Sequence, residues 1–533
     1  MNLLNLIINN RKHSYFLFFL ALIISLTFFV GTVPTHIFGH DIFFLLDNGW
    51  RVYNGQSPHV DFTSAWGPVT FLITALGMKI SGGSIDAVGY GSALYGLIIG
   101  LWSYWLCGNR LVPAVRILLC LYLVCLAVAP FPLGVNFKMS SHAMVYNRYG
   151  YTLLALILID IYCFKENKEN YKDLLIVGAS SGIAIAIALF LKASYFGAAI
   201  ILTLFSLLSK NISRPYLLGI IASFTITTIF LLYFIQYDII AILNDLKIAA
   251  GARSNSVFIN IILIKILYNL PVIFFIILLG IKSHHAEPNK SYSLSFNIIY
   301  FCLVILFVDI LIISSNQQYL TLPLSIIFSL LLYNNINTLP PPNKNKSPSY
   351  FSTIKLHLIT PEIIFFLIFF GFDISGLSYG ALQKSKDPET FSTKRFSESR
   401  ISSLILFDNN TEPKTNGSLY TEYINDGIDL IKKNSKPNEK VLAMEMFNPF
   451  SYALGRQPAK GGIAAAAFNY TISDKYHPSE NKFFGTSDIL MVPKRPASPN
   501  IFYDGFYKIY QPSIKKKFKL IAESKFWYFY RKK

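Results

Sequence analysis

The polar stretch at residues 37–87 carries the side chains best suited to chemistry. Its part at residues 41–68 holds three aspartates, Asp41, Asp47 and Asp61, and the stretch directly follows an apolar run at residues 15–33. At about 1.5 Å per helical residue, such a run is long enough to cross a bilayer. A carboxylate at a membrane boundary is partly desolvated, which raises its basicity. Such a carboxylate is a candidate general base that would take a proton from an attacking hydroxyl group.

Cations and hydrogen-bonding side chains occur in other polar stretches, next to later apolar runs. Group transfer from a lipid phosphate needs both kinds of group, because a carboxylate accepts the proton of the attacking hydroxyl while cations hold the phosphate that leaves. Interfacial anchoring and snorkelling are the alternative explanation of such cations. The candidate substrate-binding residues are His59, Asp61, Tyr146, Arg148, Lys192, Tyr195 and Arg253.

The aspartates in the stretch 37–87, called the first loop below, can also be explained by structural roles. Asp41 suits the cap position of a helix within the loop, since aspartate is an ordinary N-cap residue. Asp61 follows Gly55 and Pro58, so it fits a turn or cap as well as a contact to a sugar or acceptor hydroxyl. We expect Asp47 to be a solvated surface acid.

The three candidate phosphate ligands differ in their surroundings. Lys192 lies between two apolar runs with almost no loop around it, so its charge must meet an anion or snorkel to the interface. Arg148 begins an apolar run, and its guanidinium can bind a phosphate through two parallel hydrogen bonds. Arg253 lies in the loop sequence Gly-Ala-Arg-Ser, where it is either a phosphate ligand or simply exposed.

The composition is that of a multi-span membrane protein. Of the 533 residues, 53% are hydrophobic and only 14% are charged, and the mean hydropathy is +0.45. Repeated apolar runs of this kind need lipid as their solvent. About eleven runs are long enough to be spans, near residues 15–35, 88–107, 112–134, 149–164, 174–191, 194–208, 215–236, 258–281, 294–313, 320–336 and 358–378.

The distribution of lysine and arginine predicts the orientation. If Arg11 and Lys12 are cytoplasmic and residues 69–80 form an interfacial helix rather than a span, the basic loops fall on the cytoplasmic side. The chain is then an inner-membrane protein with a cytoplasmic N-terminus. This topology places five segments on the outer, periplasmic face: 37–87, 135–148, 237–257, 314–319 and all residues from about 380 onward.

The predicted fold is an all-α polytopic membrane domain followed by a small α/β domain. The membrane domain takes residues 1–379 and includes the outer-face loop 37–87. From residue 380 to 533 polar residues, proline and charge increase. There, residues 441–444 and 526–530 resemble strands and residues 420–433 resemble a helix. About 150 residues suffice for a domain with its own core.

Cysteine usage and net charge exclude other classes. The five cysteines all fall inside apolar runs, which argues against a disulfide framework or a metal site built on thiolates. The formal net charge of +18 is spread over short loops and the C-terminal part, without the aromatic and basic modules of nucleic-acid-binding proteins. We expect membrane lipids as partners and no nucleic acid.

The first loop carries a spaced set of residues over roughly thirty positions: Asp41, Gly49, Gly55, Pro58, Asp61, Phe62, Gly67 and Pro68. At these spacings it resembles the first loop of GT-C superfamily glycosyltransferases, in the protein O-mannosyltransferase and aminoarabinose-transferase-like branch. These enzymes use polyprenyl-phosphate sugars. Two positions depart from the pattern, since Ile42 replaces a second acid and His59 replaces a tyrosine.

The resemblance implies an inverting transfer on the periplasmic side. The donor would be a sugar on a polyprenyl-phosphate carrier, undecaprenyl phosphate in bacteria, and the acceptor a lipid, glycan or protein of the cell envelope. Asp41 would be the general base. Because Ile42 replaces the second acid, an acidic dyad or metal site loses support, and no cofactor is assigned beyond the lipid-linked donor; participation of a divalent ion stays open.

Two alternative functions remain. A lipid-linked glycan polymerase or ligase also acts on the outer face, but such enzymes usually carry their main polar loop late in the chain. A transporter or flippase would need discontinuous helices and paired charges near the middle of the membrane. Here the polar candidates gather at one face.

Overall fold

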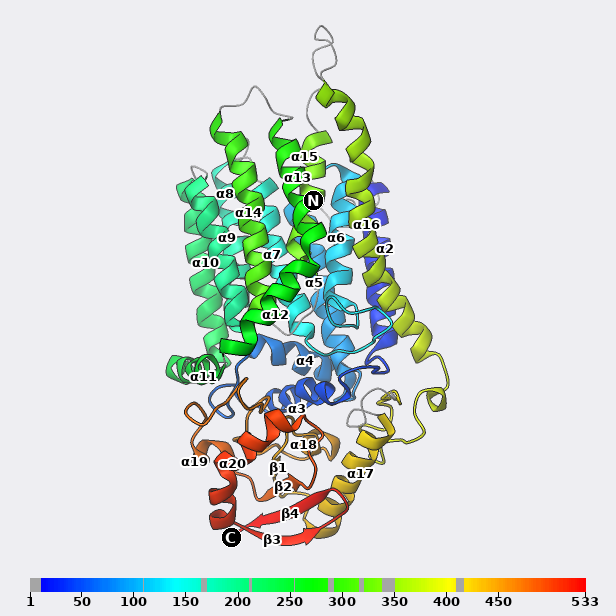
Figure 1. Ribbon diagram of the computed structural model, residues 1–533, viewed down its shortest axis with the longest axis vertical. Coiled ribbons are helices and arrows are strands. Elements are labelled where there is room, and N and C mark those ends of the chain that lie inside the picture. Colours follow the sequence, from blue (N-terminus) through cyan, green and yellow to red (C-terminus); the bar gives the residue numbers. More distant parts are fainter. Residues whose placement is uncertain are drawn as a thin grey trace.

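The computed structural model describes residues 11–108, 110–163, 170–209, 213–253, 255–285, 292–315, 321–337, 350–408 and 417–533. Most of the chain is helical, and a small sheet lies near the C-terminus (Figure 1). Within the described residues, four helices are long and apolar enough to cross a membrane, or five if one bent pair counts as a single span. Shorter apolar helices stand beside them. The predicted count of about eleven spans stays a prediction.

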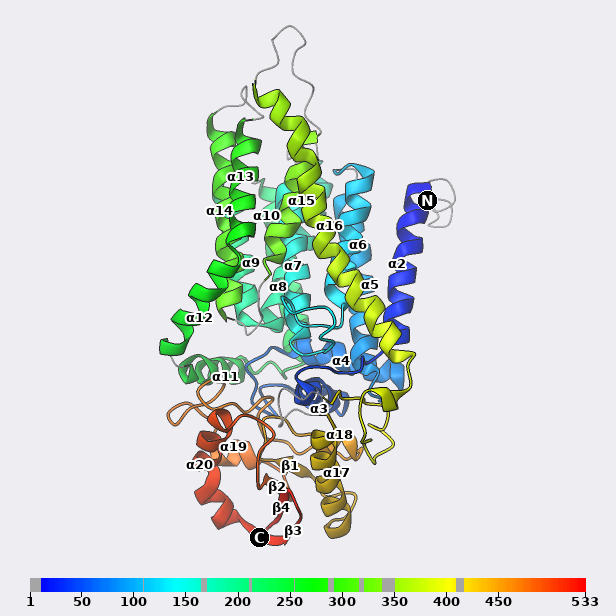
Figure 2. The same cartoon turned by 45° about the vertical axis from the view of Figure 1, so that its right-hand side comes forward.

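The long helices form an upright bundle (Figures 1 and 2). Apolar side chains dominate these helices, and many of them face outward, as expected where lipid is the solvent. The bundle helices are α2 (Arg11–Val30), α5 (Ala87–Cys107), α6 (Pro113–Val128), α7 (Val145–Cys163), α8 (Tyr171–Leu191), α9 (Ala193–Ser209), α10 (Arg214–Tyr233), α12 (Asn255–Tyr268), α13 (Leu270–His285), α14 (Tyr292–Ser315), α15 (Pro323–Asn337) and α16 (Tyr350–Lys384).

One predicted span is broken. The run 258–281 is divided between α12 and α13, which are bent by 59° at Asn269. Pro271 has no amide hydrogen for the helix ladder, and such a residue kinks or ends a helix. The Asn269 amide donates to the carbonyl oxygen of Lys265 at 2.9 Å. The sequence pattern missed this break because the apolar character continues across it.

Short helices cross the base of the bundle. They are the 3-10 turn η1 (Gly39–Asp41), α3 (Ile42–Tyr53), α4 (Pro68–Ser81) and α11 (Ile239–Ala252) (Figures 1 and 2). The helix α4 covers the helix predicted at 69–80, and its placement in the membrane interface stays a prediction. It begins with proline at its first position, where the missing amide hydrogen costs nothing. It packs between α3 and α5.

A mixed sheet lies beyond these base helices. Among the described residues it has four strands, β1 (Val441–Ala443), β2 (Ile489–Pro493), β3 (Phe518–Glu523) and β4 (Trp527–Lys532), in the order β1-β2-β4-β3. The first pair is parallel and the other pairs are antiparallel. The two predicted strands appear as β1 and β4, and the predicted helix as α17 (Gly417–Asn434). The remaining short helices are η3 (Pro388–Thr390), α18 (Phe450–Ala453), α19 (Glu480–Phe484) and α20 (Asn500–Lys517).

The first loop, α11 and the C-terminal segment (residues 385–533) meet at one end of the bundle, opposite the start of α2 (Figure 1). The Thr35 amide donates to Ile405 at 2.8 Å, and the Thr63 amide donates to Gly462 at 3.1 Å. The loop before α7 joins the same end, since the His36 amide donates to Ser140 at 2.8 Å. The described parts of four segments predicted to share a membrane face, 37–87, 135–148, 237–257 and 380–533, therefore share one end of the molecule. Residues 316–319 of the fifth segment lie outside the described residues.

Candidate functional site

Asp41 lies at the end of the turn η1, directly before α3. Its carboxylate pairs with His40 Nε2 at 3.1 Å. Burial raises the pKa of Asp41, and the nearby His40 acts in the opposite direction. Asp41 occupies the N-cap position of α3, yet its side chain accepts no capping hydrogen bond. The carboxylate is thus not used as a cap, and its raised pKa suits a proton acceptor.

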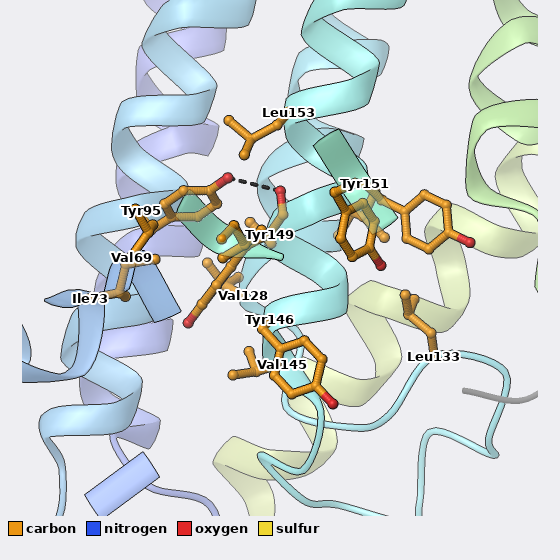
Figure 3. Packing of buried hydrophobic residues seen from close by; sticks show 14 of the residues in the cluster. Val69, Ile73, Tyr95, Val128, Leu133, Val145, Tyr146, Tyr149, Tyr151 and Leu153 are labelled. Atoms are coloured by element: carbon orange, nitrogen blue, oxygen red, sulfur yellow. Dashed lines mark hydrogen bonds between the residues drawn. The ribbon is translucent and has the colours of Figure 1, made fainter. Parts of the chain in front are cut away.

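Lys192 lies in the single-residue break between α8 and α9. Its Nζ lies 5.1 Å from the centre of the Tyr146 ring at the start of α7. Burial and the nearby Arg253 lower the pKa of Lys192 to about 7. Tyr146 is also within electrostatic reach of Asp41 and Arg253. Figure 3 shows Tyr146 at the edge of the packed core, with its hydroxyl directed away from Tyr149.

The close contact between the first loop and α8 explains how Lys192 reaches this place. The Gly67 amide donates to the carbonyl oxygen of Leu191 at 3.0 Å. A Cβ atom on Gly67 would lie 2.0 Å from the carbonyl oxygen of Phe190, so only glycine allows this approach. The loop that carries Asp41 is therefore held against the residues that immediately precede Lys192.

Arg253 joins the same group from the end of α11. Its guanidinium lies 5.2 Å from the centre of the Tyr470 ring, and it hydrogen bonds the Tyr470 side chain. Burial raises the pKa of Tyr470; Arg253 opposes that rise, and Asp41 adds to it. Tyr470 is thus close to both the acid and the cation. Sequence reasoning missed this tyrosine because nothing marks it among the 32 tyrosines of the chain.

His59 and Asp61 lie in the same loop but have protein partners. His59 Nδ1 is 3.0 Å from an oxygen of Asp245 on α11. One Asp61 oxygen accepts the Ser57 amide at 2.8 Å, and the other pairs with Lys460 Nζ at 3.0 Å. Both side chains therefore fix the loop to its neighbours, and their assignment to substrate binding stays a prediction.

Arg148 and Tyr195 have other partners than the group formed by Asp41, Lys192, Arg253, Tyr146 and Tyr470. The Arg148 guanidinium pairs with Asp373 of α16 at 3.0 Å and donates to the carbonyl oxygens of Phe131 and Leu126. The Tyr195 hydroxyl donates to the carbonyl oxygen of Asn147 at 3.1 Å, and the side chain is fully buried. Both contacts hold bundle helices together, and substrate binding by either residue stays a prediction.

The expectation that Asp47 is solvated is wrong. Its side chain is buried and pairs with Arg51 Nε at 2.8 Å, one turn along α3. Arg51 also donates to the carbonyl oxygens of Ala459 and Gly461. The C-terminal segment covers this face of α3, so the Asp47–Arg51 ion pair is buried and not exposed to solvent. A contact 400 residues away in sequence cannot be inferred from the local pattern.

The described residues around Asp41 do not supply a set of metal-ligating side chains. Across the described ranges, no group of three or more histidine, cysteine, aspartate or glutamate side chains is arranged to hold a metal ion. Asp41 has one imidazole beside it, while the other charged neighbours named above are cations. Participation of an ion thus remains open, without a candidate site.

Comparisons with known proteins identify the fold. Neither a protein-family model nor a curated protein sequence matches the chain. Among solved structures, the chain resembles ArnT from Cupriavidus metallidurans in the apo state, with 12% identity, a TM-score of 0.50 and 98% of each chain covered. The same protein bound to undecaprenyl phosphate gives a TM-score of 0.48 at 12% identity, covering 97% of this chain and 98% of that one. At this identity the likeness shows the fold alone: this chain has the fold of ArnT, in agreement with the resemblance found in the first loop.

Proposed function

We propose that this chain is an integral-membrane inverting glycosyltransferase that moves a sugar from a polyprenyl-phosphate carrier to a cell-envelope acceptor. The observation that carries the proposal is the meeting of Asp41 with Lys192 and Arg253 around Tyr146 and Tyr470. The fold and the resemblance of the first loop point the same way. The acceptor, whether lipid, glycan or protein, is left open by these residues.

In this reaction Asp41 is the general base. The acceptor oxygen forms a bond to the anomeric carbon of the sugar, and the bond from that carbon to the phosphate oxygen breaks. The acceptor proton passes to the Asp41 carboxylate, whose burial raises its pKa and so favours uptake of the proton. Lys192 and Arg253 hold the departing phosphate, because adjacent cations stabilise the negative charge that remains on the lipid.

The proposed site faces the periplasm. Arg11 and Lys12 at the start of α2 lie at the opposite end of the bundle from the first loop and the C-terminal segment, which agrees with a cytoplasmic N-terminus. Sugar nucleotides are cytoplasmic, so a periplasmic enzyme takes its sugar from a lipid carrier, undecaprenyl phosphate in bacteria. Residues 1–379 form the catalytic membrane domain and residues 380–533 the periplasmic domain in this proposal. Impermeant thiol reagents should label Tyr53→Cys in intact spheroplasts; labelling only after lysis would refute this orientation.

Transfer by purified membranes tests the function. Membranes with the parent protein, Asp41→Asn or Asp504→Asn receive radiolabelled polyprenyl-phosphate sugars and envelope acceptors. General-base removal lowers transfer by about 10²–10⁴-fold, whereas Asp504 is exposed on α20 and its variant should match the parent. Equal transfer by the Asp41 variant would remove that residue from the mechanism. No transfer by the parent from any donor would refute the function itself.

A transporter or flippase is the second candidate. The bent pair α12 and α13 favours it, because transporters commonly build their binding sites at broken helices. Lys265 of α12 is mostly buried beside this break and donates to the carbonyl oxygen of Ile313 at 3.2 Å. In proteoliposomes, a flippase would move the labelled lipid between leaflets without forming a new glycosidic bond. That result would replace the transferase proposal.

A further inference from the structure

Asp245 of α11 is a buried carboxylate with partners from two other parts of the chain, the first loop and α19. One oxygen accepts the Ser64 amide at 2.9 Å and lies 3.0 Å from His59 Nδ1, both in the first loop. The other accepts from Lys482 Nζ of α19 at 3.0 Å. Lys482 also donates to the carbonyl oxygen of His59 at 2.9 Å. The Asp245 side chain has no solvent exposure, so this charge depends on these partners.

The same face of α11 continues toward the site. Ile248, three residues on, packs against the hydrophobic core of the C-terminal segment. At Gly251 a Cβ atom would lie 2.6 Å from the Tyr476 ring, so that ring rests directly on the helix backbone. Arg253 then contacts Tyr470. Residues three apart lie on one side of a helix, so a single docked face runs from Asp245 to the end of α11.

Within the described residues, the opposite face of α11 carries exposed apolar side chains. Ile239, Ile240 and Leu243 are exposed, and the helix lies across the base of the bundle (Figure 2). An apolar helix face at the base of the bundle would lie in the membrane interface. The interface holds such a helix at one depth but does not stop it from moving in the plane of the membrane. The docked face therefore fixes the position of α11. Its charged and buried contacts are those of the Asp245 cluster, which consists of Asp245, His59, Ser64 and Lys482.

We infer that Asp245 is a positioning residue, which through α11 holds Arg253 across the site from Asp41. This inference rests on the proposed function, since it assigns Arg253 to the lipid phosphate. The cluster joins the first loop, α11 and α19, so it fixes the acid and the cation in one frame. Asp245 itself touches none of the reacting atoms.

A double-substitution experiment separates positioning from general stabilisation. Asp245→Asn should raise the KM for the lipid-linked donor about tenfold, because a misplaced Arg253 weakens donor binding. It should also lower kcat, because the departing phosphate loses the same contact. Asp245→Asn in an Arg253→Ala background should cause no further loss, because the affected contact is already absent. If the loss in the double variant is instead the product of the losses in the two single variants, Asp245 acts only through the stability of the fold, and the inference is overturned.

The matched control is Asp238→Asn on the same helix. Asp238 is exposed and caps α11 by accepting the Ala241 amide at 2.9 Å, and asparagine caps equally well. This variant should keep the parental KM and kcat. A rise like that of the Asp245 variant would assign the effect to α11 as a helix and not to the buried cluster.

A second measurement does not depend on catalysis. Ala252 is buried at the end of α11, so a maleimide should label Ala252→Cys slowly in the parent and several-fold faster with Asp245→Asn. Unchanged labelling overturns the inference. If labelling accelerates but the parent neither binds nor transfers from a polyprenyl-phosphate sugar, the positioning of α11 stands and the proposed function fails.

Discussion

Two regions of the molecule hold buried cations in different ways. Inside the bundle, the Arg148 guanidinium faces the Asp373 carboxylate and two main-chain carbonyl oxygens. At the base, Lys192 faces the ring of Tyr146 and the positive charge of Arg253. The first cation is paired with Asp373. The pKa of the second is lowered to about 7, mainly by burial and further by the positive charge of Arg253.

We propose that this difference separates a cation that stabilises the fold from a cation that binds the donor phosphate. Removing one partner of a buried ion pair strongly destabilises the folded protein, because the remaining charge stays unpaired in a low-dielectric medium. Two cations that share a site repel each other, and an anion between them relieves the repulsion. From this comparison we expect Arg148 to matter for folding and Lys192 to matter for donor binding.

The largest expected effect follows from Arg148. Arg148→Met leaves Asp373 buried without its ion-pair partner, so we expect a loss of about 3–5 kcal/mol in stability, measured as thermal unfolding in detergent. The double variant Arg148→Met/Asp373→Leu should recover much of that loss, because both charges are gone. A stable Arg148→Met protein with weak donor binding would instead support the phosphate-ligand role suggested by the sequence.

Lys192→Met tests the other side of the comparison. We expect transfer to fall by about 10²-fold, as when one preorganised donor to a developing anion is removed, while the thermal unfolding temperature is kept or raised. Lys247→Met, on the exposed side of α11, is the control and should behave like the parent. A drop in stability without a change in donor KM would assign Lys192 to the structural class beside Arg148.

The pH dependence gives a smaller effect of defined sign. Lys192 has a lowered pKa of about 7 and binds phosphate best when charged, so donor affinity should fall as the pH rises above 7, by at most about tenfold per unit. On the acid side, the raised pKa of Asp41 predicts loss of activity at a higher pH than for an ordinary aspartate. Kinetics from pH 5 to 9 measure both limbs, and Lys192→Arg should flatten only the alkaline one. An alkaline limb that persists in this variant would refute the assignment.

Local patterns predicted the parts of this molecule that depend on neighbouring residues. The helix predicted at 69–80 appears as α4, and the strands predicted at 441–444 and 526–530 appear as β1 and β4. These features follow from apolar periodicity and from β-rich composition.

Long-range pairing explains what the sequence did not show. Asp373 is 225 residues from Arg148, and Lys482 is 237 residues from Asp245. Such pairs depend on how helices and the C-terminal segment pack, which no local pattern encodes. Tyr470 was missed for the same reason. Asp47 was wrongly expected to be solvated because its covering surface comes from residues near 460.

The smallest expected effect concerns the ion pair between Lys460 and Asp61. The Lys460 side chain is 59% exposed, so solvent screens its charge, and Asp61 keeps the Ser57 amide when the lysine is removed. Lys460→Ala should therefore change stability by less than about 1 kcal/mol and leave donor KM and kcat near parental values. The same assay with Asp61→Asn is informative, because the sequence allows Asp61 to bind an acceptor or sugar hydroxyl. If Lys460→Ala is silent but Asp61→Asn raises the KM for the acceptor alone, Asp61 belongs with the binding residues; equal, small effects on stability from both variants would place the pair with the structural contacts of Arg148.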